Sequence, residues 1–417
     1  MNAHAARTGG VLGIVGAALL IGGCASVIAP QIIAAQPGGL QASYEKSATG
    51  RFVLENIDPY ISVHRRIDVG PPPATLAVAV IPPGNYSFRF GTHQRPDCTT
   101  LYLTGAAEEQ LFDAVNRSCL AEHRISEAEL RRKSADGSLN CAAPPASSAI
   151  LRRYRASVAR LRSAAPPRGT VLLLPGYGIG KLSMLPWALL LGQAGYQSIL
   201  VDLRAQGQST GKYVTYGALE SRDLVQLVAA LRRADLIRGR LGLLGESMGA
   251  ATALLAAPHI PRLAAVVAIS PYERATTVIP RYARLAYWYA EFIPSGSWWA
   301  AERKAGRIAG VRLAEADPIN AVSNIHAPVL YLQGGRDQVV SSAQAHRLAA
   351  RTPEARLLTF PTLGHLQMSE DFAGLASPVI NWYNRFLAKD RQQEKPPLLG
   401  PPPGKQIAFV VAGCVHY

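Results

Sequence analysis

The sequence predicts an α/β protein with a doubly wound, mostly parallel sheet, a short helical, aromatic-rich cap and an N-terminal insertion. In the second half of the 417-residue chain, short apolar runs alternate with helical segments. That alternation is typical of parallel sheets covered by helices on both faces. We expect strands at residues 170–174, 196–201, 241–244, 264–269, 329–332 and 356–360. Functional residues are expected on the loops beyond the carboxyl ends of these strands.

A serine on a tight turn is the second observation. Gly245-Glu246-Ser247-Met248-Gly249 joins the strand at 241–244 to an alanine-rich helical stretch. The two glycines permit a strained turn with close backbone approach, which lifts the serine hydroxyl clear of the sheet. The helix amino terminus then points at the hydroxyl, and the amide of Met248 points to where an oxyanion would form. The pattern predicts that Ser247 is a nucleophile.

The third observation is an acid and a base on the loops after later strands. Asp337 follows the strand at 329–332, and His365 follows the strand at 356–360. A serine hydroxyl needs a base within hydrogen-bond reach and a third group that orients the base. The order Ser, Asp, His along the chain is the order expected for this architecture. We therefore expect Ser247, Asp337 and His365 to form a catalytic triad.

Each of these assignments has an alternative. Ser247 could merely cap its helix, and Asp337 could form an Asx turn or cap the helix that begins near residue 341. The rival acid is Asp317, which precedes a strand instead of following one. The rival bases are His326, which also precedes a strand, and His346, which lies in a helical segment.

A second oxyanion-hole amide is expected from the loop after the first parallel strand. That loop reads Pro175-Gly176-Tyr177-Gly178. We assign the amide of Tyr177 to the hole together with that of Met248, and Gly178 is the alternative to Tyr177.

Five segments are predicted along the chain. They are a signal peptide at 1–23, a lipid-anchored tether at 24–50, strands and a Cys-containing helical insertion at 51–168, the catalytic core at 169–388 with its cap at about 271–327, and a Pro-rich tail at 389–417. Within the third segment, residues 75–81 and 86–90 flank a Pro-Pro-Gly-Asn turn and predict a β-hairpin. This hairpin could form the antiparallel opening of the larger sheet.

The first residues have the form of a targeting signal. Arg7 precedes an apolar run at 11–21, which is too short for a comfortable membrane span, and the run ends in Gly22-Gly23-Cys24. This ending resembles a bacterial lipoprotein cleavage box, and the resemblance implies that Cys24 is lipidated and that the protein faces the periplasm from the outer membrane. The alternative is an ordinary secretory signal, which would give a secreted or soluble periplasmic protein.

Four further cysteines are present, and outside the cytoplasm they can pair. They are Cys98, Cys119, Cys141 and Cys414. We expect one disulfide among the first three, with buried free thiols as the alternative, and the sequence does not choose a pairing.

The charge and the aromatic residues restrict the partners. The net charge of +15 comes from scattered arginines without a dense basic block, which argues against nucleic-acid binding and favours anionic membrane surfaces. The densest aromatic stretch lies in the cap: Tyr282, Tyr287, Trp288, Tyr289, Phe292, Trp298 and Trp299. It could form a wall for an acyl or aromatic group or a membrane-facing surface, or it could simply pack a core of its own.

Residues 169–387 resemble the α/β-hydrolase superfamily, most closely its esterase, lysophospholipase and serine-aminopeptidase-like branches. The matching motifs are Leu174 to Gly178, Asp202 to Ser209, Gly245 to Gly249, Gly334 to Val340 and Gly364-His365. The chain departs from the family at Pro175 and at Ala205-Gln206, where relatives often carry His and Gly-His.

The resemblance implies a serine hydrolase that cleaves carboxylic esters through an acyl-enzyme, without a metal or organic cofactor. An apolar acyl or lipid-like substrate is favoured by the aromatic cap and the membrane tether. A thioesterase or a peptidase would use the same triad. The alternative from another class is a non-catalytic envelope interaction protein on a hydrolase scaffold.

Overall fold

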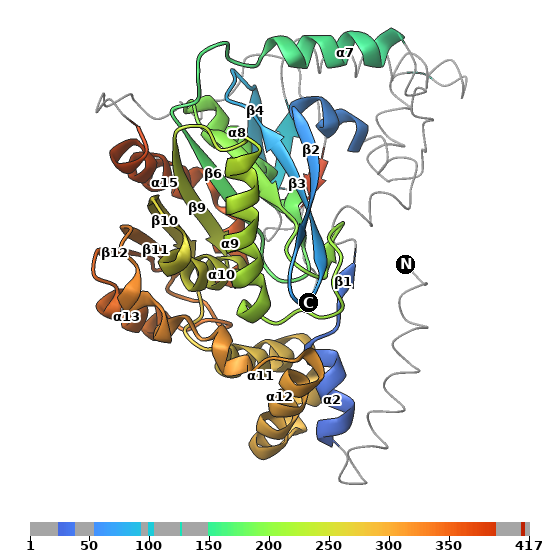
Figure 1. Ribbon diagram of the computed structural model, residues 1–417, viewed down its shortest axis with the longest axis vertical. Helices are drawn as coiled ribbons and strands as arrows, with labels where there is room; N and C mark the ends of the chain where they lie inside the picture. The colour runs from blue at the N-terminus through green and yellow to red at the C-terminus, as the bar shows by residue number, and fades with distance from the viewer. Residues whose placement is uncertain are drawn as a thin grey trace.

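The computed structural model describes residues 24–37, 54–92, 99–103, 126, 149–388 and 410–412. Its centre is an eight-stranded sheet in the order β12-β11-β10-β9-β6-β7-β3-β2. Figure 1 shows this sheet with β12 at one edge and β2 at the other. The strands of this sheet are β2 (Val63–Val69), β3 (Ala74–Ile81), β6 (Gly169–Leu174), β7 (Gln197–Val201), β9 (Arg240–Glu246), β10 (Leu263–Ile269), β11 (Val329–Gly334) and β12 (Ala355–Phe360). All six strands predicted for the parallel part are present, with ends shifted by at most two residues.

The order of the strands creates a switch point at β6. From β6 the chain moves to β7 on one side and then returns to β9 on the other, and all three strands are parallel. Leu174 pairs with Gly245, so the loop after β6 and the turn after β9 leave the sheet side by side. Crevices at such a point are the usual binding sites of doubly wound sheets.

Helices α9 (Ala218–Arg233) and α10 (Met248–Ala256) cover one face of the sheet, and α8 (Leu185–Gln193) and α15 (Phe372–Phe386) cover the other. The remaining helices in the described residues are α2 (Cys24–Ile32), α7 (Ala149–Arg160), α11 (Ala275–Ala286), α12 (Ser295–Ala309), α13 (Ser342–Arg351) and α14 (His365–Glu370). Residues of β6 alternate between two cores: Leu172 packs with α9 and α10, while Leu173 packs with α8 and α15. The fully apolar sequence of β6 follows from burial on both faces.

The predicted hairpin of 75–81 with 86–90 is wrong. The strand β3 pairs with β2 across the turn at 70–73, and it pairs with β7 on its other side. Because both edges of β3 are occupied, the following strand β4 (Phe88–Thr92) joins a separate three-stranded sheet with β5 (Thr99–Leu103) and β13 (Val410–Ala412). The expectation that the segment opens the large sheet in antiparallel fashion holds for β3.

The expected tether differs from the structure over residues 24–37. Helix α2 packs against α12 of the cap, and β1 (Gln36–Pro37) pairs in parallel with β8 (Gln206–Gly207). Ala29, Ile32 and Ile33 are buried there. The rest of the tether, the signal peptide and the four cysteines Cys98, Cys119, Cys141 and Cys414 lie outside the described residues.

The cap crosses the carboxyl ends of the strands, and α2, α11 and α12 lie together at the lower end of the molecule in Figure 1. Between α11 and α12 runs the 3-10 segment Trp288–Phe292, and three more 3-10 turns lead back to β11. No helix in the described part of the chain has both the length and the apolar character that a membrane crossing requires.

Candidate active site

Ser247 occupies a strained turn between β9 and α10. Its φ is 49°, in the left-handed region that side chains rarely adopt, and its amide donates a 2.8 Å hydrogen bond to the carbonyl of Ile269. A Cβ at Gly245 would lie 2.3 Å from the carbonyl oxygen of Gly249, and one at Gly249 would lie 2.1 Å from that of Leu174. Both glycines are therefore required by close backbone approach, as predicted for a turn that presents a nucleophile.

The structure brings Ser247, His365 and Asp337 into one hydrogen-bonded relay. His365 Nε2 lies 3.0 Å from Ser247 Oγ, and His365 Nδ1 lies 2.7 Å from Asp337 Oδ2. The His365 side chain is 10% exposed and that of Asp337 is fully buried. This is the geometry in which a histidine takes a proton from a serine while a carboxylate holds the ring in place.

Asp337 is itself held in position. Its Oδ1 accepts hydrogen bonds from the amides of Val339 and Val340, at 2.9 and 2.7 Å. Gln333 Nε2 donates to Oδ2 at 3.1 Å, beside the bond from His365. Four donors thus fix one carboxylate, which leaves it little freedom to rotate. The Asx-type turn considered as an alternative is present, and it coexists with the contact to His365.

The rival residues lie elsewhere. Asp317 accepts a 2.9 Å hydrogen bond from the amide of Ala275 and pairs with Arg274, so it fastens the start of the cap. Burial raises the pKa of Asp317 to about 6. His326 is exposed before β11, and His346 is exposed on α13.

The loop after β6 lies against the nucleophile. A Cβ at Gly176 would be 3.8 Å from the Cβ of Ser247. Met248 is the first residue of α10, where a backbone N–H has no acceptor within the helix. The amide of Gly178 donates to Gln206 Oε1 at 2.6 Å. Because the N–H of Gly178 already donates to Gln206, it is not available to an oxyanion, which favours the N–H of Tyr177 as the second oxyanion donor.

Gln206 stands at the position where the family often carries histidine. Its side chain is fully buried, and it joins the loop after β7 to the loop after β6 through Gly178. The sequence indicated only that this position shapes a loop. Its hydrogen bond from the N–H of Gly178 could be found only from the structure, because the two residues are 28 positions apart in the sequence.

An apolar cavity of about 330 Å³ lies beneath the cap, next to Tyr177. The Tyr177 ring stacks on Tyr216 at 5.6 Å and meets Tyr282 edge-on at 5.9 Å between ring centroids. Gln36 Nε2 donates to the Tyr177 hydroxyl at 2.9 Å. Further lining comes from the cap and from the N-terminal segment: Val27, Ile28, Gln31, Ile32, Ala34, Ile279, Ala283, Tyr287, Tyr289, Ala290, Ile293 and Trp298. Sequence reasoning did not anticipate that residues 27–36 would form one wall.

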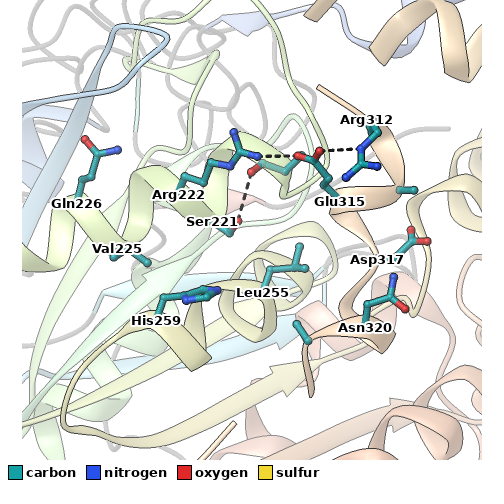
Figure 2. A pocket seen from close by; sticks show the side chains of 13 residues that line it. Ser221, Arg222, Val225, Gln226, Leu255, His259, Arg312, Glu315, Asp317 and Asn320 are labelled. Carbon is teal, nitrogen blue, oxygen red and sulfur yellow. Dashed lines mark hydrogen bonds and ion pairs between the residues drawn. The ribbon is translucent and has the colours of Figure 1, made fainter. Parts of the chain in front are cut away.

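A second depression, of about 860 Å³, opens between α9, the end of α10 and residues 312–321. Figure 2 shows that Arg222 and Arg312 reach toward the same Glu315, with which both form ion pairs. Both of its arginines thus share one carboxylate, and its lining includes neither a residue of the relay nor one of the loop after β6, whereas the cavity beneath the cap includes Tyr177 of that loop. The relay, and not this depression, is the candidate active site.

Glu246 is buried directly before the nucleophile. Trp187 Nε1 donates to its Oε1 at 2.8 Å. Burial raises the pKa of this carboxyl to about 8, and the nearby Glu370 adds to the shift. The side chain is therefore neutral at pH 7, which avoids an unpaired charge beneath the turn.

Comparisons with known proteins found likenesses to part of this chain. Residues 165–308 match the family model described as serine aminopeptidase, S33. The uncharacterized protein YqkD of Bacillus subtilis is 29% identical over 206 residues, which span 48% of this chain and 65% of that protein. An uncharacterized protein of Mycobacterium tuberculosis is 29% identical over 200 residues, spanning 47% of this chain and 63% of that one. The matched stretches thus cover less than two thirds of these relatives.

Solved structures were also found with a partial likeness. An esterase of Pyrococcus furiosus is 24% identical and covers 53% of this chain and 83% of its own, with a TM-score of 0.43. A 2,6-dihydroxy-pseudo-oxynicotine hydrolase is 15% identical and covers 82% of this chain and 71% of its own, with a TM-score of 0.49. The order of the strands and the turn that carries Ser247 are those of an α/β-hydrolase fold, and the family model matches about a third of this chain, residues 165–308.

Proposed function

We propose that this protein is a serine hydrolase that cleaves carboxylic esters through an acyl-enzyme intermediate. The observation that carries the proposal is the relay from Ser247 Oγ through His365 to Asp337, with contacts of 3.0 and 2.7 Å. It stands at the switch point of the sheet, beside two loops that supply backbone donors.

In the first half of the reaction, Ser247 Oγ attacks the ester carbonyl carbon while His365 Nε2 takes the hydroxyl proton. The negative charge that develops on the carbonyl oxygen is stabilised by the amides of Met248 and Tyr177. His365 then gives its proton to the leaving alkoxide. The C–O bond of the ester breaks, and the acyl group remains on Ser247.

In the second half, water takes the place of the alcohol. His365 removes a proton from the water as its oxygen attacks the acyl carbon, and the same amides hold the second oxyanion. The bond to Ser247 Oγ breaks, His365 returns the proton to that oxygen, and a carboxylic acid leaves. Asp337 keeps the Nδ1 proton of His365 directed toward itself throughout, so that Nε2 is free to accept.

The cavity supports an apolar acyl group or a lipid-like ester as the substrate. Its volume of about 330 Å³ is lined mainly by aromatic and aliphatic side chains, and its polar groups are side-chain amides, tyrosine hydroxyls and the indole N–H of Trp298. Binding pockets of this kind select apolar ligands through area buried from water.

A peptidase is the second candidate, because the matching family is described as serine aminopeptidase. An aminopeptidase has to hold a protonated amino group, which a buried carboxylate would do best. The described lining of the cavity contains no carboxylate. The ester is therefore favoured over a peptide with a free amino terminus.

The position in the cell is part of the proposal. The Gly-Gly-Cys ending of the apolar run supports lipidation of Cys24 and a place at the cell envelope, with the outer membrane favoured. In that case a high-salt wash releases Cys24→Ser but not the wild type from the membrane fraction, and mass spectrometry finds the lipid on residue 24 of the wild type only. Unchanged fractionation together with an unmodified Cys24 would contradict this.

A substrate panel tests the activity. It compares kcat/KM for p-nitrophenyl esters of increasing acyl length, matched acyl thioesters and aminoacyl anilides. We expect esters to exceed anilides by several orders of magnitude and a preference for medium over two-carbon acyl groups. Faster cleavage of the anilides would support the peptidase instead.

A further inference from the structure

The exposed large apolar side chains of the described surface lie in one part of the chain, the cap. The large hydrophobic residues that are exposed in the described part of the chain all belong to the cap, at 39% to 71% exposure. They are Leu285, Tyr287, Trp288, Phe292, Trp299 and Ile308, which we call the aromatic face. A concentration of this kind on an otherwise polar surface marks an interaction site.

Three of the four aromatic rings of this face, those of Tyr287, Trp288 and Phe292, form one contiguous group with the half-buried Tyr289. Trp288 meets Phe292 and Tyr289 edge-on, each at 6.1 Å between ring centroids, and Tyr287 stacks on Tyr289 at 5.5 Å. Trp and Tyr side chains are enriched where a membrane meets water, because one end of each ring is apolar and the other polar. The face thus has the composition of an interfacial anchor.

Basic side chains accompany these rings. Residues 275–310 contain Arg281, Arg284, Arg303, Lys304 and Arg307, against the acidic residues Glu291 and Glu302. Glu302 is buried, and its burial together with the nearby Asp317 carboxylate raises its pKa to about 8, so it is neutral at pH 7. Arg303 stacks over Trp299 at 3.8 Å from the ring centroid. The charge of the cap therefore complements an anionic surface.

The N-terminal helix lies on the same side. Helix α2 packs on α12, and Lys304 Nζ donates to Ser26 Oγ at 2.7 Å. The carboxyl end of α2 leads through β1 to the core. Its amino end, at Cys24, therefore lies on the side away from the sheet, where the cap also lies (Figure 1). Tyr287 belongs both to the aromatic face and to the lining of the cavity. The face and the cavity are thus adjacent.

We propose that the aromatic face is a docking surface for an anionic lipid bilayer and turns the mouth of the cavity toward the membrane. The docking itself does not depend on the catalytic assignment, whereas capture of a lipid-like ester from the bilayer rests on the proposed function. A second copy of this chain is the competing occupant of the face, and the tests below distinguish the two.

The first test is quenching of tryptophan fluorescence in the full-length protein. The protein is reconstituted into vesicles of phosphatidylglycerol and phosphatidylcholine that carry brominated acyl chains. Trp187, Trp298 and Trp382 are buried in the protein, so lipid quenching reports Trp288 and Trp299. We expect clear quenching in the wild type and its loss in the double variant Trp288→Phe, Trp299→Phe. Equal quenching in both proteins, or none in either, would overturn the proposal.

The second test measures vesicle binding in a full-length Cys24→Ser background, so that no lipid on residue 24 contributes. Arg303→Ala with Arg307→Ala is expected to weaken binding to phosphatidylglycerol vesicles roughly 30-fold. The matched control is Arg153→Ala with Arg160→Ala, which removes the same charge from exposed positions of α7, at the opposite end of the molecule in Figure 1. The control should change binding less than about threefold. Equal losses in the two variants would contradict a specific face.

Light scattering and a soluble substrate complete the design. A dimer that Trp288→Ser dissociates, without any effect on vesicle binding, would assign the face to a second copy and overturn the membrane proposal. Hydrolysis of a short water-soluble ester should be unchanged in all these variants. If the wild type binds vesicles but does not hydrolyse the ester, the proposed function alone is contradicted. If it hydrolyses the ester but does not bind vesicles, the docking proposal alone is contradicted.

Discussion

The nucleophile turn and the cap lie at the same edge of the sheet, yet they are built in opposite ways. The turn is buried, strained and fixed on every side: Ser247 has a φ of 49°, and its neighbouring glycines touch backbone. The cap consists of short helices and 3-10 turns, and its outer aromatic rings are exposed. Gly296 in α12 has no atom within 4 Å of where a Cβ would stand.

This difference matches two different requirements, one for catalysis and one for substrate access. A reaction centre has to hold a few atoms within tenths of an ångström, which requires a rigid frame of strand ends and fixed donors. Access and substrate choice need exposed area, which the outer side of the cap provides. Changes at the turn should therefore abolish catalysis or folding, whereas changes in the cap should alter only binding.

The largest effect is expected for Asp337→Asn. The new Oδ1 can still accept from Val339 and Val340, so the loop should keep its shape, but the Nδ2 group would face His365 Nδ1 as a donor. The histidine would then hold the wrong tautomer, and kcat should fall roughly 10³- to 10⁴-fold with KM little changed. Steady-state kinetics and a thermal melt measure this. A loss of less than tenfold with an intact fold would remove Asp337 from the relay.

Glu246→Gln comes next and tests the buried neutral carboxyl. The folded pKa is about 8, above the ordinary value of 4.5, so the contribution of Glu246 to stability is complete below pH 4.5 and is lost as the pH rises through 8. The glutamine cannot ionise and can still accept from Trp187. As the pH rises from 5 to 8, the free energy of unfolding measured in urea should fall in both proteins. The fall should be about 2 to 4 kcal/mol smaller in the variant than in the wild type.

The exposed cap supplies the control for that experiment. Glu291→Gln makes the same substitution at an exposed position, and the pH profile of unfolding of this variant should run parallel to that of the wild type. Parallel pH profiles for wild type and Glu246→Gln would show that Glu246 is ionised in the fold.

Two glycine-to-alanine changes compare the regions directly. Gly249→Ala forces a Cβ to 2.1 Å from the carbonyl oxygen of Leu174, and relief of that clash should cost about 1–3 kcal/mol of unfolding free energy, together with activity. Gly296→Ala adds a methyl group in open space within a helix, and it should stabilise the protein by up to about 1 kcal/mol. Equal changes in the free energy of unfolding for the two variants, measured by chemical unfolding, would contradict the structural difference between the turn and the cap.

The smallest effect is expected for Gln36→Ala. It removes the 2.9 Å donor on the Tyr177 hydroxyl and loosens one wall of the cavity. A loss of about 1 kcal/mol in binding would raise KM for long acyl esters roughly fivefold and leave kcat for short ones unchanged. Ser26→Ala, outside the cavity on α2, serves as the control. An equal change for all chain lengths would argue that Gln36 acts on the fold and not on the pocket.

The parallel strands and the relay could be predicted because their signals are local. A strand that is buried on both faces, such as β6, has apolar residues at every position, so it is recognisable as a continuous apolar run. Each residue of the relay lies on a loop directly after such a run. Ser247 also carries its own turn signal in the flanking glycines. These patterns need no knowledge of which strands are neighbours.

The remaining features depend on contacts between distant segments. The pairing of β3 with β2 and β7 was not predicted, because sequence spacing does not show that both edges of β3 are taken. Helix α2 was assigned to a tether, because its partner α12 lies about 270 residues away and only docking buries Ile32 and Ile33. The Tyr177 wall completed by Gln36 was missed for the same reason.

Covalent labelling with a fluorophosphonate tests the central claim most directly, because the probe reacts with a serine only where a base and an oxyanion hole activate it. Wild type and Ser247→Ala are compared at matched folding, with the labelled peptide identified by mass spectrometry. The account predicts one label on Ser247 in the wild type and none in the variant. A well-folded wild type that takes up no label, or a label that persists in Ser247→Ala, would contradict it.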